Sequence, residues 1–404
     1  MIYLKLAWRS LWRNRRRTVI TTTSVAFAVI LATTMRCLQL GSYDKMIENV
    51  VGYYTGYIQL QGKEYWKTRS LDEGFTYTDS LNSIILSIKE VESITPRLES
   101  YVLSGGETKT KVALVIGSDP ENEDRVTKLS DKLVLGSYFN DSIPSVLLAD
   151  GLAQALKLNL NDTVVILGQG YHGTSAAAKY TVSGIVHFNA PELNKQLIYL
   201  PLKEAQWLFG GDVITSVSLM LDKPQNMTAV AQQLTQTLGD LYEIKDWKDM
   251  MPDLDEAIKA DNSGGLIMVS VLYIIIAFGI FGTLIMMFIE RKREFGVLVS
   301  LGMKRIQLAV TIFIESISIG IMGTMAGFAL SIPVVFWLHN HPIRFTGEAA
   351  KGFESYGFEP IMITSLDSSI FIAQGALVFI LTSALSLYPF FKLLKLDALK
   401  AMRM

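Results

Sequence analysis

The stretch ERKREFGVLVSLGMKRI, residues 290–306, lies between two long apolar runs, and its interpretation decides how the rest of the chain is arranged. Phe295, Leu298 and Leu301 recur every three residues, a spacing that places apolar side chains along one face of a helix. Gly302 then predicts the end of that helix. Five cations flank the apolar residues: Arg291, Lys292, Arg293, Lys304 and Arg305. Two interpretations fit: an amphipathic loop on lipid headgroups, or a helix that a soluble partner binds.

The composition of the chain is that of a membrane protein. Of its 404 residues 50% are hydrophobic, and the mean hydropathy is +0.31. The apolar residues concentrate in four runs: 18–40, 266–289, 307–338 and 368–391. Each run reaches the roughly 20 residues that a helix needs to cross about 30 Å of hydrocarbon. The sequence therefore predicts an α-helical membrane protein with four transmembrane helices.

Basic residues are distributed unevenly beside these runs. Residues 1–17 carry six cations and no acid, residues 290–306 carry five cations, and residues 392–404 carry four. The loop 339–367 has two cations against four acids. The positive-inside rule therefore places both termini and residues 290–306 in the cytoplasm. We expect a multi-pass membrane protein whose residues 41–265 and 339–367 lie outside the cytoplasm.

Residues 1–17, MIYLKLAWRSLWRNRRR, have the pattern of an amphipathic helix. One face would carry apolar residues and the other basic residues: Leu4, Trp8, Leu11 and Trp12 against Lys5, Arg9, Arg13 and Arg16. Such a helix lies flat in the membrane interface with its tryptophans at headgroup depth. The alternative is that the cations only set the topology.

Residues 41–265 alternate strand-like and helix-like patterns, which predicts a large α+β domain between the first and second transmembrane helices. Strands are expected at 57–61, 111–116, 163–167, 180–186, 197–200 and 213–221, and helices at 81–91, 152–158, 201–209 and 227–238. A helix at 249–261 would lead into the second transmembrane helix through a joint at residues 263–265. Cys37 is the single cysteine, so no internal disulfide can hold this domain.

Four polar residues inside the apolar runs are candidates for a substrate site or cavity. Thr33 and Thr34 suit a helix interface or a cavity wall better than contact with lipid. Arg36 lies near the outer end of the first helix, where it either snorkels to water or meets a lipid headgroup. Glu315 should face other helices or water, since an unpaired carboxylate at that depth is costly. Both a structural polar contact and a functional relay fit Glu315.

Several catalytic functions are excluded by the sequence. There is no G-x-x-x-x-G-K-[ST] loop to hold the phosphates of ATP. LSGGE at 103–107 resembles the signature loop of ABC ATPases, but without a P-loop it predicts only a hairpin turn. Neither HExxH nor G-x-S-x-G occurs, and the outer domain has no basic cluster suited to nucleic acid. We predict no catalytic, cofactor-binding or metal-binding residues in this chain.

The arrangement resembles the FtsX/MacB/LolE permeases, the mechanotransmission or type VII class of ABC transporters, over nearly the whole chain. The most specific part is REFGVLVSLG, residues 293–302, which is similar to the family's coupling helix R-E-[IF]-G-x-L-x-[AS]-[LI]-G. Glu315 follows where the family often has Glu. The segments 6–18, 148–164, 182–186 and 388–403 also match: LAWRSLWRNRRRT, LADGLAQALKLNLNDTV, VSGIV and YPFFKLLKLDALKAMR.

This resemblance implies partners. A separate ATPase subunit would bind ATP and Mg, and this chain would bind no cofactor itself. The residues implied in coupling are Arg293, Glu294, Phe295, Gly296, Val297, Leu298, Leu301 and Gly302, with Phe295, Val297, Leu298 and Leu301 in a cleft of the ATPase. A second permease, identical or homologous, and membrane lipids are the other partners implied, and no nucleic acid is.

The layout is most similar to the lipoprotein-releasing permeases LolC/LolE, which implies lipoprotein cargo and a periplasmic carrier. In those proteins a hook containing proline docks the carrier, and the corresponding residues 168–179 have no proline here. Carrier docking is therefore left open. One alternative is a MacB-like efflux permease with a periplasmic adaptor and an outer-membrane duct. The other is an FtsX-like regulator of a cell-wall hydrolase, against which the size of the outer domain argues.

Overall fold

The computed structural model describes residues 7, 9, 11–13, 15–140, 144–355 and 360–395. Of the predicted N-terminal helix, Leu4, Lys5 and Trp8 lie outside the described residues, as does most of the tail 392–404. The chain forms two compact units. Residues 1–44, 258–344 and 361–404 build a helical bundle, and residues 45–257 and 345–360 build an α+β domain.

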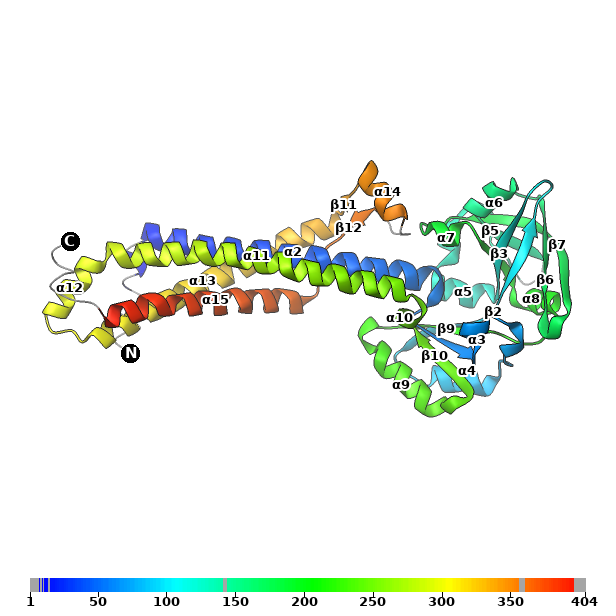
Figure 1. Cartoon of the computed structure of the whole chain (residues 1–404), viewed down its shortest axis with the longest axis horizontal. Coiled ribbons are helices and arrows are strands. Elements are labelled where there is room, and N and C mark those ends of the chain that lie inside the picture. Colours follow the sequence, from blue (N-terminus) through cyan, green and yellow to red (C-terminus); the bar gives the residue numbers. More distant parts are fainter. Residues whose placement is uncertain are drawn as a thin grey trace. The chain divides into compact units, whose positions relative to one another are not determined.

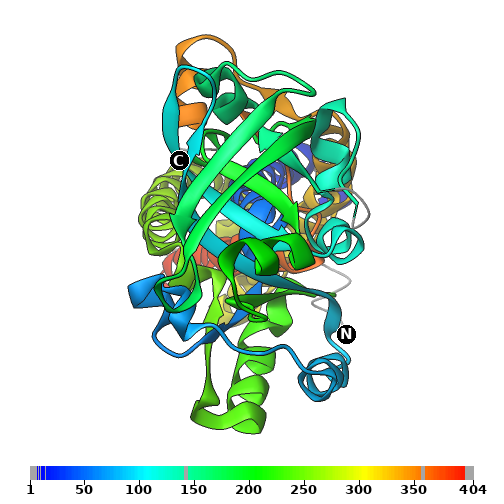
Figure 2. The ribbon, with the colours of Figure 1, turned by 90° about the vertical axis from the view of Figure 1, so that its right-hand side faces the viewer.

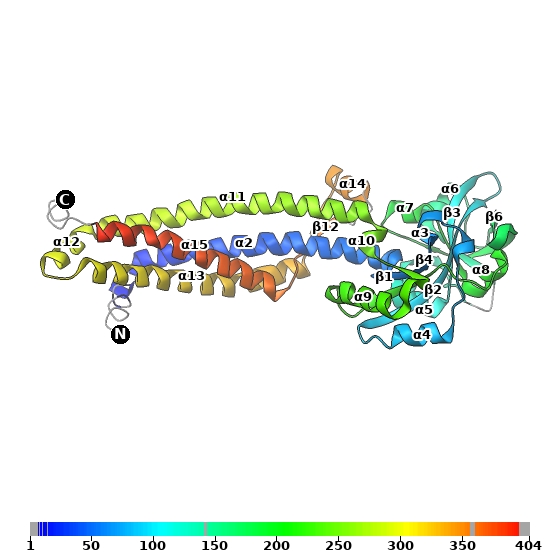
Figure 3. The ribbon, with the colours of Figure 1, turned by 60° about the horizontal axis from the view of Figure 1, so that its bottom comes forward.

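The bundle contains the four helices that the hydropathy pattern predicts. They are α2 (Arg15–Val50), α11 (Pro252–Glu290), α13 (Arg305–Asn340) and α15 (Ser368–Leu394). Each is long and apolar enough to cross a membrane, which confirms the prediction of four such helices. A short helix, α12 (Lys292–Ser300), joins α11 to α13. Figures 1 and 3 both show the four long helices side by side, with α12 at one end of the bundle.

The predicted joint at residues 263–265 is wrong, because α11 is helical from Pro252 to Glu290. A glycine weakens a helix by about 1 kcal/mol but keeps its backbone N–H, so it need not interrupt the hydrogen-bond ladder. Gly265 instead permits close packing. A Cβ built at Gly265 would lie 1.7 Å from Nε2 of Gln39 in α2.

Small residues also bring α13 against α2. A Cβ at Gly323 would lie 2.6 Å from Cβ of Val25, and one at Gly327 would lie 2.7 Å from the backbone oxygen of Ala26. The Gly-x-x-x-Gly step thus serves close approach of two helices within this chain. Side chains from α2, α11, α13 and α15 together form the apolar centre of the bundle: Val25, Ala28, Val29, Ile280, Leu284, Met287, Ile319 and Val378.

The α+β domain is built on a ten-stranded mixed sheet with the path β10-β1-β9-β2-β3-β8-β5-β7-β4, while β6 pairs with β2 and β7. The strands are β1 (Ile58–Gly62), β2 (Val91–Gly105), β3 (Thr110–Ser118), β4 (Leu133–Gly136), β5 (Ser145–Ala149), β6 (Thr163–Gln169), β7 (Ser175–Val186), β8 (Leu197–Pro201), β9 (Ser216–Leu221) and β10 (Tyr242–Asp246). In Figure 2 the long strands, coloured cyan to green, face the viewer. The prediction of an α+β domain between the first two membrane helices is confirmed.

The chain also contains short helices, most of them around this sheet. They are η1 (Val51–Thr55), α3 (Tyr65–Thr68), η2 (Leu71–Glu73), α4 (Asp79–Leu86), α5 (Pro120–Thr127), η3 (Leu129–Lys132), α6 (Asp150–Leu156), η4 (Tyr171–Gly173), α7 (Pro191–Asn194), α8 (Leu202–Phe209), η5 (Pro224–Asn226), α9 (Met227–Leu238), η6 (Gly239–Leu241), α10 (Trp247–Met250) and α14 (Glu348–Ser355). A two-stranded sheet of β11 (Ile343–Arg344) and β12 (Ile361–Met362) flanks α14 in the chain.

The expected strands 111–116 and 197–200 lie within β3 and β8, whereas β5 is not among the expected strands although it is apolar and buried. β2 was missed because Pro96, Arg97 and Glu99 interrupt its apolar pattern, although Arg97 and Glu99 are buried. The predicted helix 81–91 is too long: α4 ends at Leu86, and Val91 already pairs with Leu221 of β9. LSGGE lies at the β2–β3 hairpin, where the Gly106 N–H donates to the Lys109 carbonyl at 2.9 Å, so the predicted turn is confirmed.

Candidate functional site

The segment 290–306 folds as the sequence predicts, with a defined stop. α12 is followed by Gly302 at a φ of +98°, a left-handed conformation that glycine adopts without steric cost. The Met303 N–H donates to the Leu298 carbonyl and the Gly302 N–H to the Val299 carbonyl, both at 3.1 Å. These two bonds are those of a Schellman motif. Gly302 is confirmed as the end of the helix.

Phe295 does not present its side chain to a partner, because it is only 1% exposed. It packs in a cluster contributed by α11, α12, α13 and α15: Phe288, Phe295, Leu308, Ala309, Ile312 and Leu393. Side chains three residues apart in a helix differ in direction by about 60° around the helix axis. Phe295, Leu298 and Leu301 therefore point in successively different directions, from the bundle toward solvent. Gly296 is buried as well. In this structure Phe295 fixes α12 to the bundle instead of extending from it.

The exposed face of α12 and the turn after it form what we call the coupling surface. Its apolar members are Val297, Leu298, Leu301 and Ile306, of which Leu298 is 39% exposed and Leu301 78%. The exposed cations Arg293, Lys304 and Arg305 surround them. Exposed apolar side chains bordered by charges are typical of a protein-binding surface.

A buried ion pair connects Arg291, just before α12, to Glu315 in the first third of α13. Nη1 of Arg291 lies 2.9 Å and 2.7 Å from the two carboxylate oxygens of Glu315. The Glu315 side chain is 3% exposed and the Arg291 side chain 11%. The guanidinium of Arg291 also stacks over the Phe295 ring at 5.1 Å. Glu315 therefore makes a structural polar contact, one of the two roles that the sequence predicts for it. Its partner is Arg291, which the sequence pattern identifies only as one of the cations beside the apolar residues.

Glu294 extends this network to the N-terminal segment. Its Oε2 lies 2.9 Å from Nη2 of Arg13 and 3.5 Å from Nε of Arg291. The Arg13–Glu294 pair is exposed, so its own contribution to stability is small. Arg13, Glu294, Arg291 and Glu315 nevertheless form a continuous chain of charges from the N-terminal segment through α12 to α13.

The other three candidate residues lie along α2. Among the residues that the structure describes, the buried hydroxyls of Thr33 and Thr34 have no hydrogen-bond partner. Nη1 of Arg36 donates to Oε1 of Gln39 at 2.7 Å and to Oδ1 of Asn262 in α11 at 2.9 Å. Arg36 thus bridges α2 and α11. The structure does not bring these residues together with Glu315.

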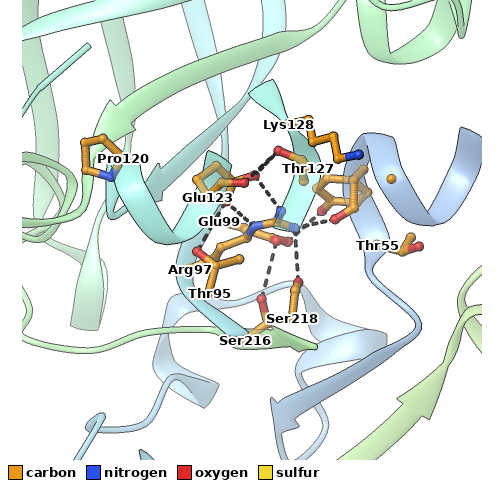
Figure 4. Close-up of polar contacts among 12 residues, drawn as sticks. Thr55, Thr95, Arg97, Glu99, Pro120, Glu123, Thr127, Lys128, Ser216 and Ser218 are labelled. Carbon is orange, nitrogen blue, oxygen red and sulfur yellow. Dashed lines mark hydrogen bonds and ion pairs between the residues drawn. The ribbon is translucent and has the colours of Figure 1, made fainter. Parts of the chain in front are cut away.

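A second buried charge network, which the sequence did not reveal, lies in the α+β domain (Figure 4). Arg97 of β2 and Glu123 of α5 are both fully buried, and Arg97 donates to the carboxylate through Nε at 2.8 Å and Nη2 at 2.6 Å. Burial alone would lower the pKa of Arg97, but the charge of Glu123 and its hydrogen bonds raise that pKa above the usual value. No sequence pattern distinguishes Glu123 from its acidic neighbours in PENEDRVT.

This network holds η1, the segment that continues α2 into the domain. Nη1 of Arg97 donates to the backbone oxygen of Tyr54 in η1 and to Oγ of Ser218 in β9. The Tyr54 hydroxyl donates to Oε2 of Glu99 at 2.6 Å. Nζ of Lys132 donates to the Gly52 carbonyl at 3.3 Å. Within the domain, η1 is therefore bonded to β2 and η3, and through Arg97 it is connected to β9 and α5.

Within the described ranges no cluster of three or more His, Cys, Asp or Glu side chains could hold a metal ion. The fold and the coupling surface together define a class: a membrane protein with four spanning helices, a large inserted α+β domain, and an α12 surface suited to a partner. Family models agree with this class. The MacB-like periplasmic core domain matches residues 18–237, and the FtsX-like permease C-terminal domain matches residues 266–398.

The chain belongs to this FtsX-like and MacB-like family of ABC transporter permeases. It is similar to the lipoprotein-releasing system transmembrane protein LolC of Xylella fastidiosa strain 9a5c, at 25% identity over 63% of this chain and 64% of that protein. LolC of strain Temecula1 is 23% identical over 82% and 83%. The macrolide export ATP-binding/permease protein MacB of Aggregatibacter actinomycetemcomitans is 22% identical over 79% of this chain and 50% of that protein. The alignment to the first spans less than two thirds of that relative.

Among solved structures, the periplasmic region of MacB from Actinobacillus actinomycetemcomitans aligns with 18% identity and a TM-score of 0.36, covering 52% of this chain and 98% of that one. Membership of the family identifies the chain as an inner-membrane permease with a periplasmic α+β domain.

The Arg291–Glu315 pair predicts a strong effect of removing one partner. Arg291→Met should destabilise the protein by about 3 kcal/mol, because it leaves a buried carboxylate unpaired. The double variant Arg291→Met/Glu315→Leu should recover most of that loss. Thermal unfolding of the purified chain in detergent measures both. Arg293→Met, which removes an exposed cation from the same helix, is the control and should change stability little. A double variant no more stable than Arg291→Met would contradict the pairing.

The Arg97–Glu123 pair generates a parallel prediction in the α+β domain. Glu123→Gln should lower the free energy of unfolding by about 3 kcal/mol, because Arg97 then stays buried without its counter-charge. Glu121→Gln on the same helix changes an exposed carboxylate and should cost less than about 0.5 kcal/mol. Circular dichroism of the full-length variants during denaturation distinguishes these outcomes. Equal losses in both variants would argue against the network.

Proposed function

We propose that this chain is the membrane-spanning subunit through which a separate ATPase moves lipid-modified cargo, most specifically lipoproteins, out of the inner membrane. In this proposal the ATPase binds ATP and Mg²⁺ and the chain itself binds neither. A second permease, a copy or a homologue, completes the transporter. The termini and the coupling surface face the cytoplasm, as the distribution of basic residues indicates.

One observation carries the mechanical part of this proposal. α12 is attached to the bundle by the apolar cluster around Phe295 and by the Arg291–Glu315 pair, while Val297, Leu298 and Leu301 remain exposed. A partner that binds the exposed residues and moves would therefore displace α13 and α15 along with α12. Arg293 and Glu294 would orient the partner through charge, and Gly302 would set the direction of the chain after α12.

At the other end of the membrane segments, chain connectivity carries movement into the periplasmic domain. α2 continues through η1 into β1, and β10 continues through α10 into α11. β1 and β10 are neighbouring antiparallel strands in which Ile58 pairs with Asp246. Displacement of α2 relative to α11 would thus act on two adjacent strands of one sheet. This arrangement suits a protein that performs mechanical work outside the membrane.

Lipoprotein cargo is supported by the LolC relatives, which are similar over as much as 82% of the chain and are named for lipoprotein release. Within the membrane segments, the buried hydroxyls of Thr33 and Thr34 and the bridging Arg36 are the proposed contacts of a cargo between helices.

Export of a small molecule is the second candidate, because MacB relatives match 79% of the chain. The hairpin at residues 168–179 also favours it. The His172 N–H donates to Oδ1 of Asp72 at 2.7 Å, and Oγ1 of Thr174 donates to the Phe209 carbonyl at 3.3 Å. The hairpin is therefore bound to its own domain, which argues against its use as a free hook for a carrier.

Cargo is tested by the ATP turnover of the purified transporter in lipid nanodiscs. Addition of an acylated lipoprotein should change turnover at least twofold, whereas the same protein without its acyl chains should have no effect. Unacylated protein is the matched control because it differs only in the lipid. A response to a macrolide and not to the lipoprotein would contradict lipoprotein cargo and support the second candidate.

Assembly with the ATPase is tested at Leu298. Leu298→Asp should abolish co-purification of the ATPase, because it places a charge in the centre of the apolar coupling surface, while the exposed position preserves folding. Leu241→Asp makes the same change at an exposed leucine of the periplasmic domain and should leave the complex intact. Stoichiometric ATPase in the Leu298→Asp preparation would overturn the assignment of the coupling surface.

A further inference from the structure

A pocket of about 410 Å³ lies at the start of α2, apart from the coupling surface. Its α2 residues are numbers 15, 18, 19, 22 and 23, the spacing of a single helix face. The N-terminal segment closes one side and α13 forms the opposite wall. The complete lining is Leu11, Trp12, Arg15, Thr18, Val19, Thr22, Thr23, Met322 and Ala326.

The pocket has one charged end and an otherwise apolar or hydroxyl lining. Of the nine lining residues only Arg15 is charged, and it is the first residue of α2. From Arg15 to Thr23 the helix rises about 12 Å, at about 1.5 Å per residue. α2 and α13 are close together along this length, since Thr22 and Val25 lie against Gly323. The pocket therefore extends from the polar boundary of the membrane into its apolar interior.

Charge complementarity determines what can occupy this pocket. The Arg15 guanidinium stacks over the Trp12 ring at 5.5 Å, which holds the cation beside the opening. Residues 1–17 contribute five further cations and no acid. Deeper in the wall, the hydroxyl of Thr22 is buried without a hydrogen-bond partner in the described part of the chain. A basic opening between membrane helices favours an anionic lipid headgroup, and the apolar interior favours an acyl chain.

We propose that this pocket binds one anionic glycerophospholipid of the adjacent leaflet. The lipid phosphate pairs with Arg15, an ester carbonyl accepts a hydrogen bond from Thr22, and one acyl chain lies along Val19 and Thr23 against Met322 and Ala326. Such a lipid joins the N-terminal segment to α2 and α13. The proposal concerns a lipid held as part of the structure and does not depend on which cargo the transporter moves.

The test uses Trp12 as the reporter. The full-length protein is reconstituted in phosphatidylcholine vesicles that contain increasing fractions of phosphatidylglycerol or phosphatidylcholine brominated on the acyl chains, which quench nearby tryptophans. The difference between wild type and Trp12→Phe isolates Trp12 among the six tryptophans. Half-maximal quenching should require about fivefold less brominated phosphatidylglycerol than brominated phosphatidylcholine.

Two pairs of variants separate the headgroup contact from the pocket. Arg15→Gln should remove the preference for phosphatidylglycerol, whereas Arg16→Gln, which removes an exposed cation outside the lining, should keep it. Ala326→Phe should fill the pocket and reduce Trp12 quenching by both lipids at least threefold. Met325→Phe, at the neighbouring exposed position, should not.

Three results would overturn the proposal. The first is equal quenching by the two lipids in the wild-type protein, which would indicate unspecific solvation by the bilayer. The second is quenching that Ala326→Phe leaves unchanged. The third is protection of Trp12 from both lipids, which would indicate that protein, such as a second copy of the chain, covers this face.

Discussion

A carboxylate inside a membrane-spanning helix requires a partner, and the end of the bundle that carries α12 depends on the pairing of Glu315 with Arg291. Arg291 precedes α12, so satisfying Glu315 fixes where α12 begins. Phe295 then fixes the rotation of α12, because its ring fits between residues of α11, α13 and α15. With both constraints in place, Val299 packs against the same cluster, whereas Val297 and Leu298 stay exposed and form part of the coupling surface.

The periplasmic domain contains a similar solution at its junction with α2. Arg97 and Glu123 are fully buried, and the pair is satisfied only when η1 supplies the Tyr54 carbonyl and β9 supplies Ser218. An apolar cluster would tolerate small displacements of η1, whereas directional hydrogen bonds to a buried charge do not.

Close packing and polar pairs therefore determine different features of the bundle: close packing sets how near the helices lie, and the polar pairs set their register. Along the length of the bundle, Gly323 and Gly327 permit α13 to approach α2 closely. At the ends, Arg36 with Asn262 and Arg291 with Glu315 define the register. Dispersion contacts between smooth helices do not by themselves select one register, whereas paired polar groups in an apolar environment do. The two ends of the membrane segments are consequently the places where the relative positions of helices are specified.

The sequence by itself determined the four membrane helices, the α+β character of the insertion, most of its apolar strands and the end of α12 at Gly302, because hydropathy, periodicity and glycine conformation are local properties. Only the tertiary structure decided that Phe295 is buried while Leu301 is exposed, and that the helix continues through Gly265. It also decided the polar partners: Glu315 pairs with Arg291, Arg97 with Glu123, and Arg36 with Asn262. Each of these depends on residues distant in the chain, and the free energy of burying a charge or a ring is set by whatever the fold places around it.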